Sequence, residues 1–209
     1  MTYNFKTCLA AGFAALSISI SGCADAQSAA SDTSSSDVVL SSTATNWDIQ
    51  AEGSHIRFSA LQEGKPFSGS FAEFSGAIRF DPATPETGIV DIYIPLGSVD
   101  AGSKDRNSTL PSKVWFSSKA FPEARFKSNT ISRQDAGYLA KGELTLKGKS
   151  VRLDLPFTLQ IDGDQAVMTG AAELDRTLWN IGAAPWDTDE WVSRQVNLDI
   201  QVTAIRGRQ

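Results

Sequence analysis

Most of the chain shows a two-residue alternation of apolar and polar side chains, which starts near Trp47. The alternation is unbroken over residues 151–161 and 196–204, and residues 90–96 repeat it. A period of two places the apolar residues on one face of a strand and the polar residues on the other. One dry face and one solvated face are typical of antiparallel sheets, so the pattern predicts an all-β fold.

Short turn signals separate these alternating runs. They are Glu63-Gly64, Thr87-Gly88, Ala136-Gly137, Lys147-Gly148-Lys149 and Asp162-Gly163. Such glycine-containing pairs between strands are typical of hairpins. No long amphipathic helix is indicated, and the best helical segment is a short crossover at about residues 109–119, which contains Pro111.

A sheet with one apolar face must cover that face and its edges, and closure into a barrel does both. Glycines also fall inside or beside the strand patterns, at positions such as 69, 76, 142 and 170, where glycine often marks a bulge or a barrel corner. We therefore predict an antiparallel closed barrel of about eight strands with one short helical crossover. A two-sheet sandwich is the alternative that the alternation alone leaves open.

The N-terminus has the pattern of an export signal. Lys6 precedes an apolar stretch over residues 7–20, which has the length of a signal-peptide core and is too short to span a bilayer. The stretch ends in Ile20-Ser21-Gly22-Cys23. This ending resembles the bacterial lipobox, which implies cleavage before Cys23 and acylation of that residue. An ordinary secretory signal with an incidental cysteine is the alternative.

Residues 24–46 are rich in serine, lack Lys and Arg, and contain only one short apolar spot at residues 38–40. Such a composition buries too little surface to offset the cost of ordering. The sequence therefore predicts three parts: a lipoprotein signal peptide (1–22), lipidated Cys23 with a flexible tether (23–46), and a folded barrel domain (47–209). By resemblance to bacterial sorting rules, Ala24 rather than Asp after the cysteine favours the outer membrane.

Composition and charge narrow the function classes. The 209 residues are 41% hydrophobic, and 19 Lys and Arg stand against 24 Asp and Glu, giving a net charge of −5. No basic run interrupts this balance, so we expect no nucleic-acid partner, because phosphate binding needs clustered cations. The only cysteine besides Cys23 is Cys8, inside the predicted signal peptide, so the exported domain is expected to have no disulfide.

Few residues offer catalytic or metal-binding chemistry. His55 is the only histidine, and a lone histidine is more often a surface or hydrogen-bonded residue than a catalyst. One histidine and two cysteines are too few for the usual zinc sites of four His and Cys ligands. The acidic residues at 162–164 and 187–190 lack the spacing of a calcium-binding loop. We therefore predict no catalytic residue, no metal site, no cofactor and no enzyme activity.

Aromatic residues are more numerous than a small barrel obviously needs for its core. An eight-stranded barrel is just wide enough either to fill with side chains or to hold one small ligand. A filled core is one interpretation, and an apolar tunnel that binds a ligand is the other. For the tunnel, the residues expected to bind the ligand are Phe58, Phe80, Ile92, Ile94, Trp115, Phe116, Leu144, Leu153, Leu155, Met168 and Trp179.

Several short segments match one family of bacterial envelope proteins in the expected order. They are SHIRF (54–58), GSFAEFSG leading to FDP (69–76 and 80–82), SVDAG (98–102), WF (115–116), FPEARF (121–126), GELTLKG (142–148) and RTLWNIG (176–182). The stretch from Trp47 to the C-terminus thus resembles the YceI-like family, whose members bind polyisoprenoids in a lipocalin-like barrel. No single segment is specific to this family, but the presence of all of them in this order is.

The resemblance implies a lipid carrier. We expect a long-chain isoprenoid of quinone or polyprenyl type as ligand, bound for storage or transport by a protein anchored to the cell envelope and facing the periplasm. A structural or stress-response envelope lipoprotein with a filled barrel is the alternative. The family usually has Arg-Asp and then His-Leu in its crossover, whereas this chain has Arg106-Asn107 and Thr109-Leu110. This departure favours a neutral head group over a pyrophosphate. The oligomeric state is left open, with a homodimer as one option.

Overall fold

The computed structural model describes residues 44–208. The predicted signal peptide, Cys23 and nearly all of the tether lie outside these residues. The first strand begins at Asn46, one residue before the expected start of the domain at Trp47. Within the described part, no helix has the length and the apolar character that crossing a bilayer requires.

Strands account for most of residues 44–208. They are β1 (Asn46–Gln62), β2 (Lys65–Phe71), β3 (Ser75–Arg79), β4 (Ile89–Pro95), β5 (Val99–Asp100), β6 (Glu123–Gln134), β7 (Gly137–Leu146), β8 (Lys149–Asp162), β9 (Gln165–Asp175) and β10 (Gln195–Arg206). The helical elements are α1 (Lys104–Thr109) and three 3-10 turns, η1 (Pro85–Thr87), η2 (Leu96–Ser98) and η3 (Arg176–Trp179).

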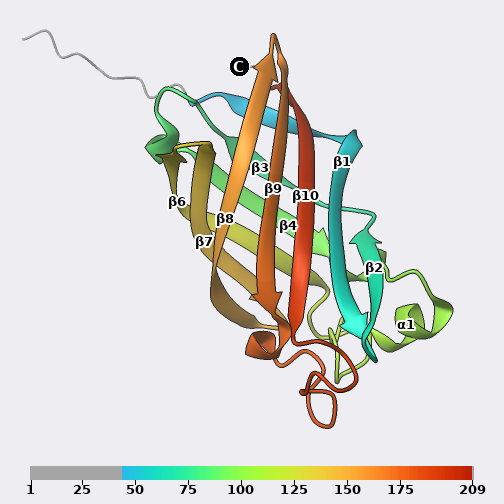
Figure 1. Cartoon of the computed structure of the whole chain (residues 1–209). Helices are drawn as coiled ribbons and strands as arrows, with labels where there is room; N and C mark the ends of the chain where they lie inside the picture. Colours follow the sequence, from blue (N-terminus) through green and yellow to red (C-terminus); the bar gives the residue numbers. More distant parts are fainter. Residues whose placement is uncertain (1–43, 209) are drawn as a thin grey trace, which may run out of the picture. The chain divides into compact units, whose positions relative to one another are not determined.

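The sheet closes on itself through the pairing of its first and last strands. Strands β10, β9, β8, β7, β6, β4, β3 and β1 follow one another around the sheet, and β1 pairs again with β10. Figure 1 shows β8, β9, β10 and β1 running side by side as one wall. All pairings are antiparallel. The predicted closed barrel of about eight strands is confirmed, and the sandwich alternative is not observed.

β1 changes partners along its length because a bulge bends it. The register against β10 shifts between Gln50 and His55, and the Ser54 hydroxyl accepts a hydrogen bond from the Thr203 N–H at 2.9 Å inside the bulge. Such bulges bend a strand and increase its twist. As a result, β1 pairs with β3 near its start and with β2 along its second half.

One part of the wall is built by the crossover rather than by strand pairing. β5 pairs only with β2, so the sheet has a free edge there among the described residues. The crossover from residue 101 to 122 follows β5, and Leu96 N–H donates to the Pro122 carbonyl at 2.8 Å where it returns to the barrel. α1 lies in this segment, close to β2 (Figure 1). Residues of the crossover therefore line the interior at this end.

The single short helix is confirmed, but its predicted position was wrong. α1 spans Lys104–Thr109 rather than about 109–119. Ser103 caps its N-terminus by accepting from the Arg106 N–H, and Asp105 lies in its first turn, which favours a helix start there. Beyond Leu110, the chain continues as turns through Pro111, a residue that does not continue a helix.

Burial follows the predicted alternation. On β8, Leu153 and Leu155 are buried, whereas Arg152 and Asp154, which alternate with them, are exposed. A predicted hairpin turn also has the expected backbone. Lys147 and Gly148 both have positive φ, 51° and 74°, as a two-residue type I′ turn requires. Local sequence chemistry thus fixes both the inward face and the hairpin register.

Candidate functional site

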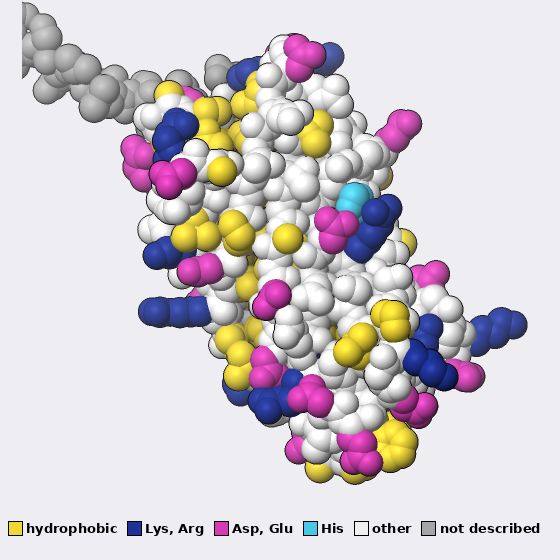
Figure 2. Space-filling model, viewed as in Figure 1, with side chains coloured by type: hydrophobic (Ala, Val, Ile, Leu, Met, Phe, Trp, Pro, Cys, Tyr) yellow, Lys and Arg dark blue, Asp and Glu magenta, His cyan; other side chains and the backbone are white. Residues whose placement is uncertain are grey.

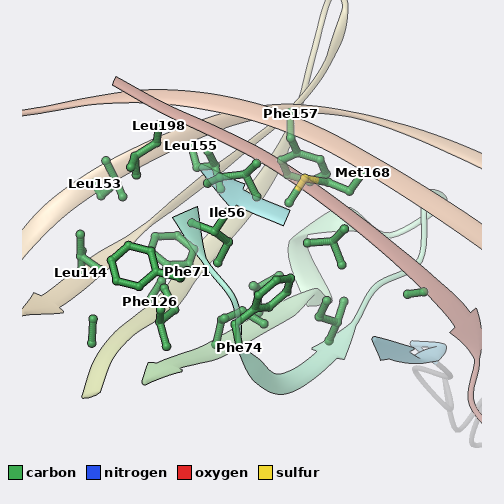
Figure 3. Close-up of a pocket in the computed structure, with 18 of the residues that line it drawn as sticks. Ile56, Phe71, Phe74, Phe126, Leu144, Leu153, Leu155, Phe157, Met168 and Leu198 are labelled. Carbon is green, nitrogen blue, oxygen red and sulfur yellow. The ribbon is translucent and has the colours of Figure 1, made fainter. Parts of the chain in front are cut away.

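A first cavity of about 160 Å³ occupies the barrel centre. Every residue that lines it is apolar, and the lining comes from nearly all of the strands. Figure 3 shows Phe71, Phe126 and Leu144 on one side of this space and Leu155 and Met168 on another, with all of them pointing inward. The cavity thus offers a ligand shape and dryness, with no polar side chain to bond.

Several side chains that line the first cavity remain partly accessible although they face inward. Among them are Phe74, Val90, Ile94, Phe157, Leu159, Met168 and Ile200. In a close-packed interior, such positions have few voids larger than a water molecule. Their residual exposure indicates an interior that its own side chains do not fill.

A second cavity of about 330 Å³ adjoins the first toward the α1 end. Successive inward residues of β1 show the direction: Ile56 lines the first cavity, whereas Phe58, Ala60 and Gln62 line the second. Most of its lining is apolar. Its polar lining residues are Gln62, Asp105, Arg106, Thr109 and Arg176. The described interior is therefore apolar along most of its length and polar at one end.

Arg176 organises the loop that covers this end. Its side chain is only 4% exposed, and burial lowers its pKa, against which the negative charges of Asp175, Asp189 and Asp187 act. The guanidinium donates to the backbone carbonyls of Ile181, Gly182, Trp186, Thr188, Val192 and Ser193. A planar group with five N–H donors suits this task. Arg176 therefore fixes the loop that brings Ile181, Trp186 and Val192 to the second cavity.

Arg106 is held by the protein from three directions. Its Nε donates to the Ala101 carbonyl at 2.6 Å, its Nη1 donates to Gln62 Oε1 at 3.0 Å, and its guanidinium lies 4.8 Å from the centre of the Phe67 ring. The neighbouring Asn107 side chain accepts from the Ala101 N–H at 2.7 Å and donates to Asp100. Asn107 thus shapes the crossover and does not line either cavity.

The interior contains few unsatisfied polar groups. Two buried indoles both donate to backbone carbonyls: Trp47 Nε1 to Phe80 at 3.0 Å and Trp179 Nε1 to Leu144 at 2.9 Å. Within residues 44–208, no buried side-chain nitrogen or oxygen lacks a hydrogen-bond partner. A ligand is therefore not needed to complete any buried polar bond there.

All eleven residues predicted to bind a ligand line one of the two cavities. Phe80, Ile92, Ile94, Leu144, Leu153, Leu155 and Met168 line the first, and Phe58, Trp115, Phe116 and Trp179 line the second. Binding of a ligand by these residues stays a prediction. The interior predicted as an apolar tunnel is lined in the structure by the residues of two adjoining cavities.

Sequence reasoning left out residues of two kinds. Ile56, Leu198, Ile200 and Val202 line the cavities and share the inward alternation, so the pattern could have identified them. Arg106 and Arg176 line the second cavity too, but nothing in the pattern distinguishes an arginine that points inward from one in solvent.

The outer face carries ordinary surface chemistry. His55 Nε2 lies 3.3 Å from Asp199 Oδ2, with Arg57 near the same carboxylate. Figure 2 shows acidic and basic side chains interspersed over the viewed face. Over residues 44–208, no group of three or more His, Cys, Asp or Glu is placed to hold a metal ion.

Comparisons with known proteins agree with this architecture. The sequence model of one protein family, the YceI-like domain, matches residues 47–204. A UPF0312 protein of Photorhabdus laumondii is 32% identical over 111 residues, which make up 52% of this chain and 58% of that protein. The chain thus aligns with less than two thirds of that curated relative.

Two solved structures share the fold. The crystal structure of Burkholderia cenocepacia BcnA is 29% identical, with a TM-score of 0.72, and the match covers 75% of this chain and 99% of that one. A polyisoprenoid binding domain from Saccharophagus degradans is 16% identical, with a TM-score of 0.57, over 78% of this chain and 99% of that one. At this identity the second likeness concerns the fold alone. Together with the domain match, these findings establish that the chain belongs to the YceI-like domain family.

Proposed function

We propose that this protein binds a long-chain isoprenoid or similar amphiphilic lipid, of quinone or polyprenyl type, inside the barrel, and that it stores or transports this lipid. The observation that carries the proposal is the first cavity, which is lined by apolar residues alone. A ligand for such a space must itself be apolar over most of its length. The name of the Saccharophagus degradans domain, a polyisoprenoid binding domain of the same fold, supports this ligand class.

The energetics of burial suit a site without polar chemistry. An isoprenoid chain that buries on the order of 600 Å² would gain roughly 15 kcal/mol at about 25 cal/mol per Å². Loss of translational freedom and ordering of the chain offset much of this gain. The remainder corresponds to a dissociation constant in roughly the micromolar-to-nanomolar range. Shape and exclusion of water are therefore sufficient for binding.

The polar end of the second cavity gives the ligand an orientation. We place the head group beside Arg106, Gln62 and Asp105, with the chain directed toward the first cavity. The Arg176 guanidinium donates to six backbone carbonyls, and Arg106 already donates to Gln62 and Ala101. With the Asp105 carboxylate in the same lining, these contacts favour a neutral head group over a pyrophosphate.

Extraction of the bound lipid tests the proposal most directly. The domain over residues 44–209, which lacks the proposed acylation site, is purified from bacterial cells without detergent and extracted with organic solvent, and the extract is identified by mass spectrometry. We expect a long-chain isoprenoid with a neutral head group in near-stoichiometric amount. An extract that contains no lipid, together with no uptake of added prenyl lipids by the extracted protein, would contradict the carrier and favour a structural envelope protein.

A larger side chain at Leu144 separates an open interior from a filled one. Leu144 is 6% exposed and lines the first cavity. We expect Leu144→Trp to block lipid binding while the melting temperature of the lipid-free protein stays unchanged, because the indole enters the cavity. Overpacking of a filled core would cost about 1–3 kcal/mol. Calorimetry measures the stability, and Glu143→Trp, on the exposed face of the same strand, is the control.

We further propose that an acylated Cys23 tethers the protein to a membrane of the bacterial envelope, facing the periplasm, with the outer membrane as the preferred location. We expect Cys23→Ala to abolish lipidation and leave the precursor uncleaved, because the thiol is the acyl acceptor of the motif. Fractionation and intact-mass measurement test this expectation. Wild-type protein that is soluble in the periplasm, with an unmodified Cys23, would contradict it.

A further inference from the structure

The two cavities meet at one level of the barrel. Four residues line both cavities, and they come from four different strands: Phe71 on β2, Leu146 on β7, Leu174 on β9 and Leu198 on β10. All other lining residues belong to one cavity only. The shared residues therefore mark the boundary between the two cavities. The first cavity, which is apolar throughout, is called the inner chamber below, and the second cavity, which has a polar end, is called the outer chamber.

Phe71 is the aromatic member of this boundary, and its ring lies within a row of aromatic rings. The ring centre is 5.8 Å from that of Phe58 and 6.3 Å from that of Phe116. Leu198, another boundary residue, is the backbone pairing partner of Phe58 on β10. The Phe71 ring thus lies between Phe58 of β1 and Phe116 of the crossover.

The backbone around Phe58 and Phe71 leaves room for this arrangement. Gly69, two residues before Phe71, lies against the Phe58 ring, and a Cβ at Gly69 would collide with that ring and with the Asp100 carbonyl. Phe71 is the last residue of β2, where the chain leaves one strand before β3 begins. Its side chain is only partly buried and borders cavity space on both sides.

We infer that Phe71 is a partition that sets the length of the isoprenoid chain accepted by the barrel. The inference rests on the proposed function, with the head group at the α1 end. A chain that enters from this end first fills the outer chamber, and its further units must pass between Phe71 and the three leucines. With the phenyl ring in place, only the last units of the chain reach the inner chamber and additional units are buried poorly, whereas a smaller side chain joins the two chambers.

A series of neutral prenyl alcohols tests this partition. Geraniol, farnesol, geranylgeraniol and solanesol are titrated into the lipid-free protein, and the dissociation constant is measured by tryptophan fluorescence, since Trp115 and Trp179 line the outer chamber. In the wild type, we expect the affinity to rise with chain length and then level off within the series. In Phe71→Ala, we expect it to continue rising, with a gain of at least about tenfold for the first alcohol beyond the wild-type limit.

Phe121→Ala is the matched control, because Phe121 is an exposed phenylalanine that lines neither cavity. This variant should keep the wild-type length limit. Phe71→Leu provides a second test with a milder change if Phe71→Ala does not fold, and Phe71→Trp should shift the limit toward shorter chains. Thermal denaturation verifies that each variant is folded.

The outcomes separate the partition from the proposed function. If the wild type binds the alcohols but its affinity never levels off, or if Phe71→Ala and Phe71→Leu keep the wild-type limit, the partition is wrong and the carrier stands. An equal shift in Phe121→Ala would also overturn it. If neither the wild type nor any variant binds a prenyl alcohol, the proposed function fails, and the partition fails with it.

Discussion

Leu155→Lys is expected to abolish lipid binding and to lower the stability of the lipid-free protein by more than about 3 kcal/mol, the scale of an uncompensated buried charge. Leu155 is 5% exposed on β8, and its side chain faces the first cavity, where no lining residue is polar. The lining offers an ammonium group no carboxylate or other polar side chain to compensate its desolvation. Lipid uptake and thermal denaturation measure the two effects.

The matched control for this substitution is Thr158→Lys, on the exposed face of the same strand. It should leave both uptake and stability near wild-type values, because surface substitutions usually change stability by less than about 0.5 kcal/mol. If Leu155→Lys is as stable as this control and still takes up lipid, the first cavity is not the site that holds the chain.

Arg176→Met is expected to destabilise the protein by about 3–5 kcal/mol, a loss typical of breaking a buried polar network. The substitution keeps an apolar stem of similar length but removes the donors for six backbone carbonyls. For a domain of this size, the melting temperature should fall by on the order of 10 °C. Binding should weaken as well, because the loop carries Ile181, Trp186 and Val192 to the second cavity.

Arg194→Met is the control for Arg176→Met, because Arg194 forms only an ordinary ion pair with its side chain. Arg194 donates to the Asp175 carboxylate at 2.9 Å, and its side chain is half exposed. Exposed pairs of this kind contribute about 0–1 kcal/mol, so this variant should melt within a few degrees of the wild type. Equal losses in the two variants would show that Arg176 has no special role in holding the loop.

Much of the barrel was predictable because its signals are local. The alternation on β8 assigned Leu153 and Leu155 to the interior, and the paired positive φ angles at Lys147 and Gly148 follow from a turn that the sequence displays. The position of α1 was missed because its start depends on the Ser103 cap. This short polar signal was outweighed by the more apolar segment that follows it.

For the candidate site, the sequence predicted only which side chains face the barrel interior. A period of two specifies which side chains of a strand point inward, and the strand residues predicted to bind a ligand all line the cavities: Phe58, Ile92, Ile94, Leu144, Leu153, Leu155 and Met168. The pattern contains no information about how far opposite side chains reach across the barrel. For that reason, the filled and the hollow interior were equally compatible with the alternation.

The sequence by itself determined the strands, their inward faces and the hairpin turns, because each depends on neighbouring residues. Tertiary structure alone decided three further features: the closure of β1 on β10, the unfilled interior with its boundary at Phe71, and the burial of Arg176 against its loop. The first two features join residues far apart in the chain, and the third depends on how the loop after Arg176 folds back over its side chain. Their geometry follows from how the strands pack around the barrel, which no local period encodes.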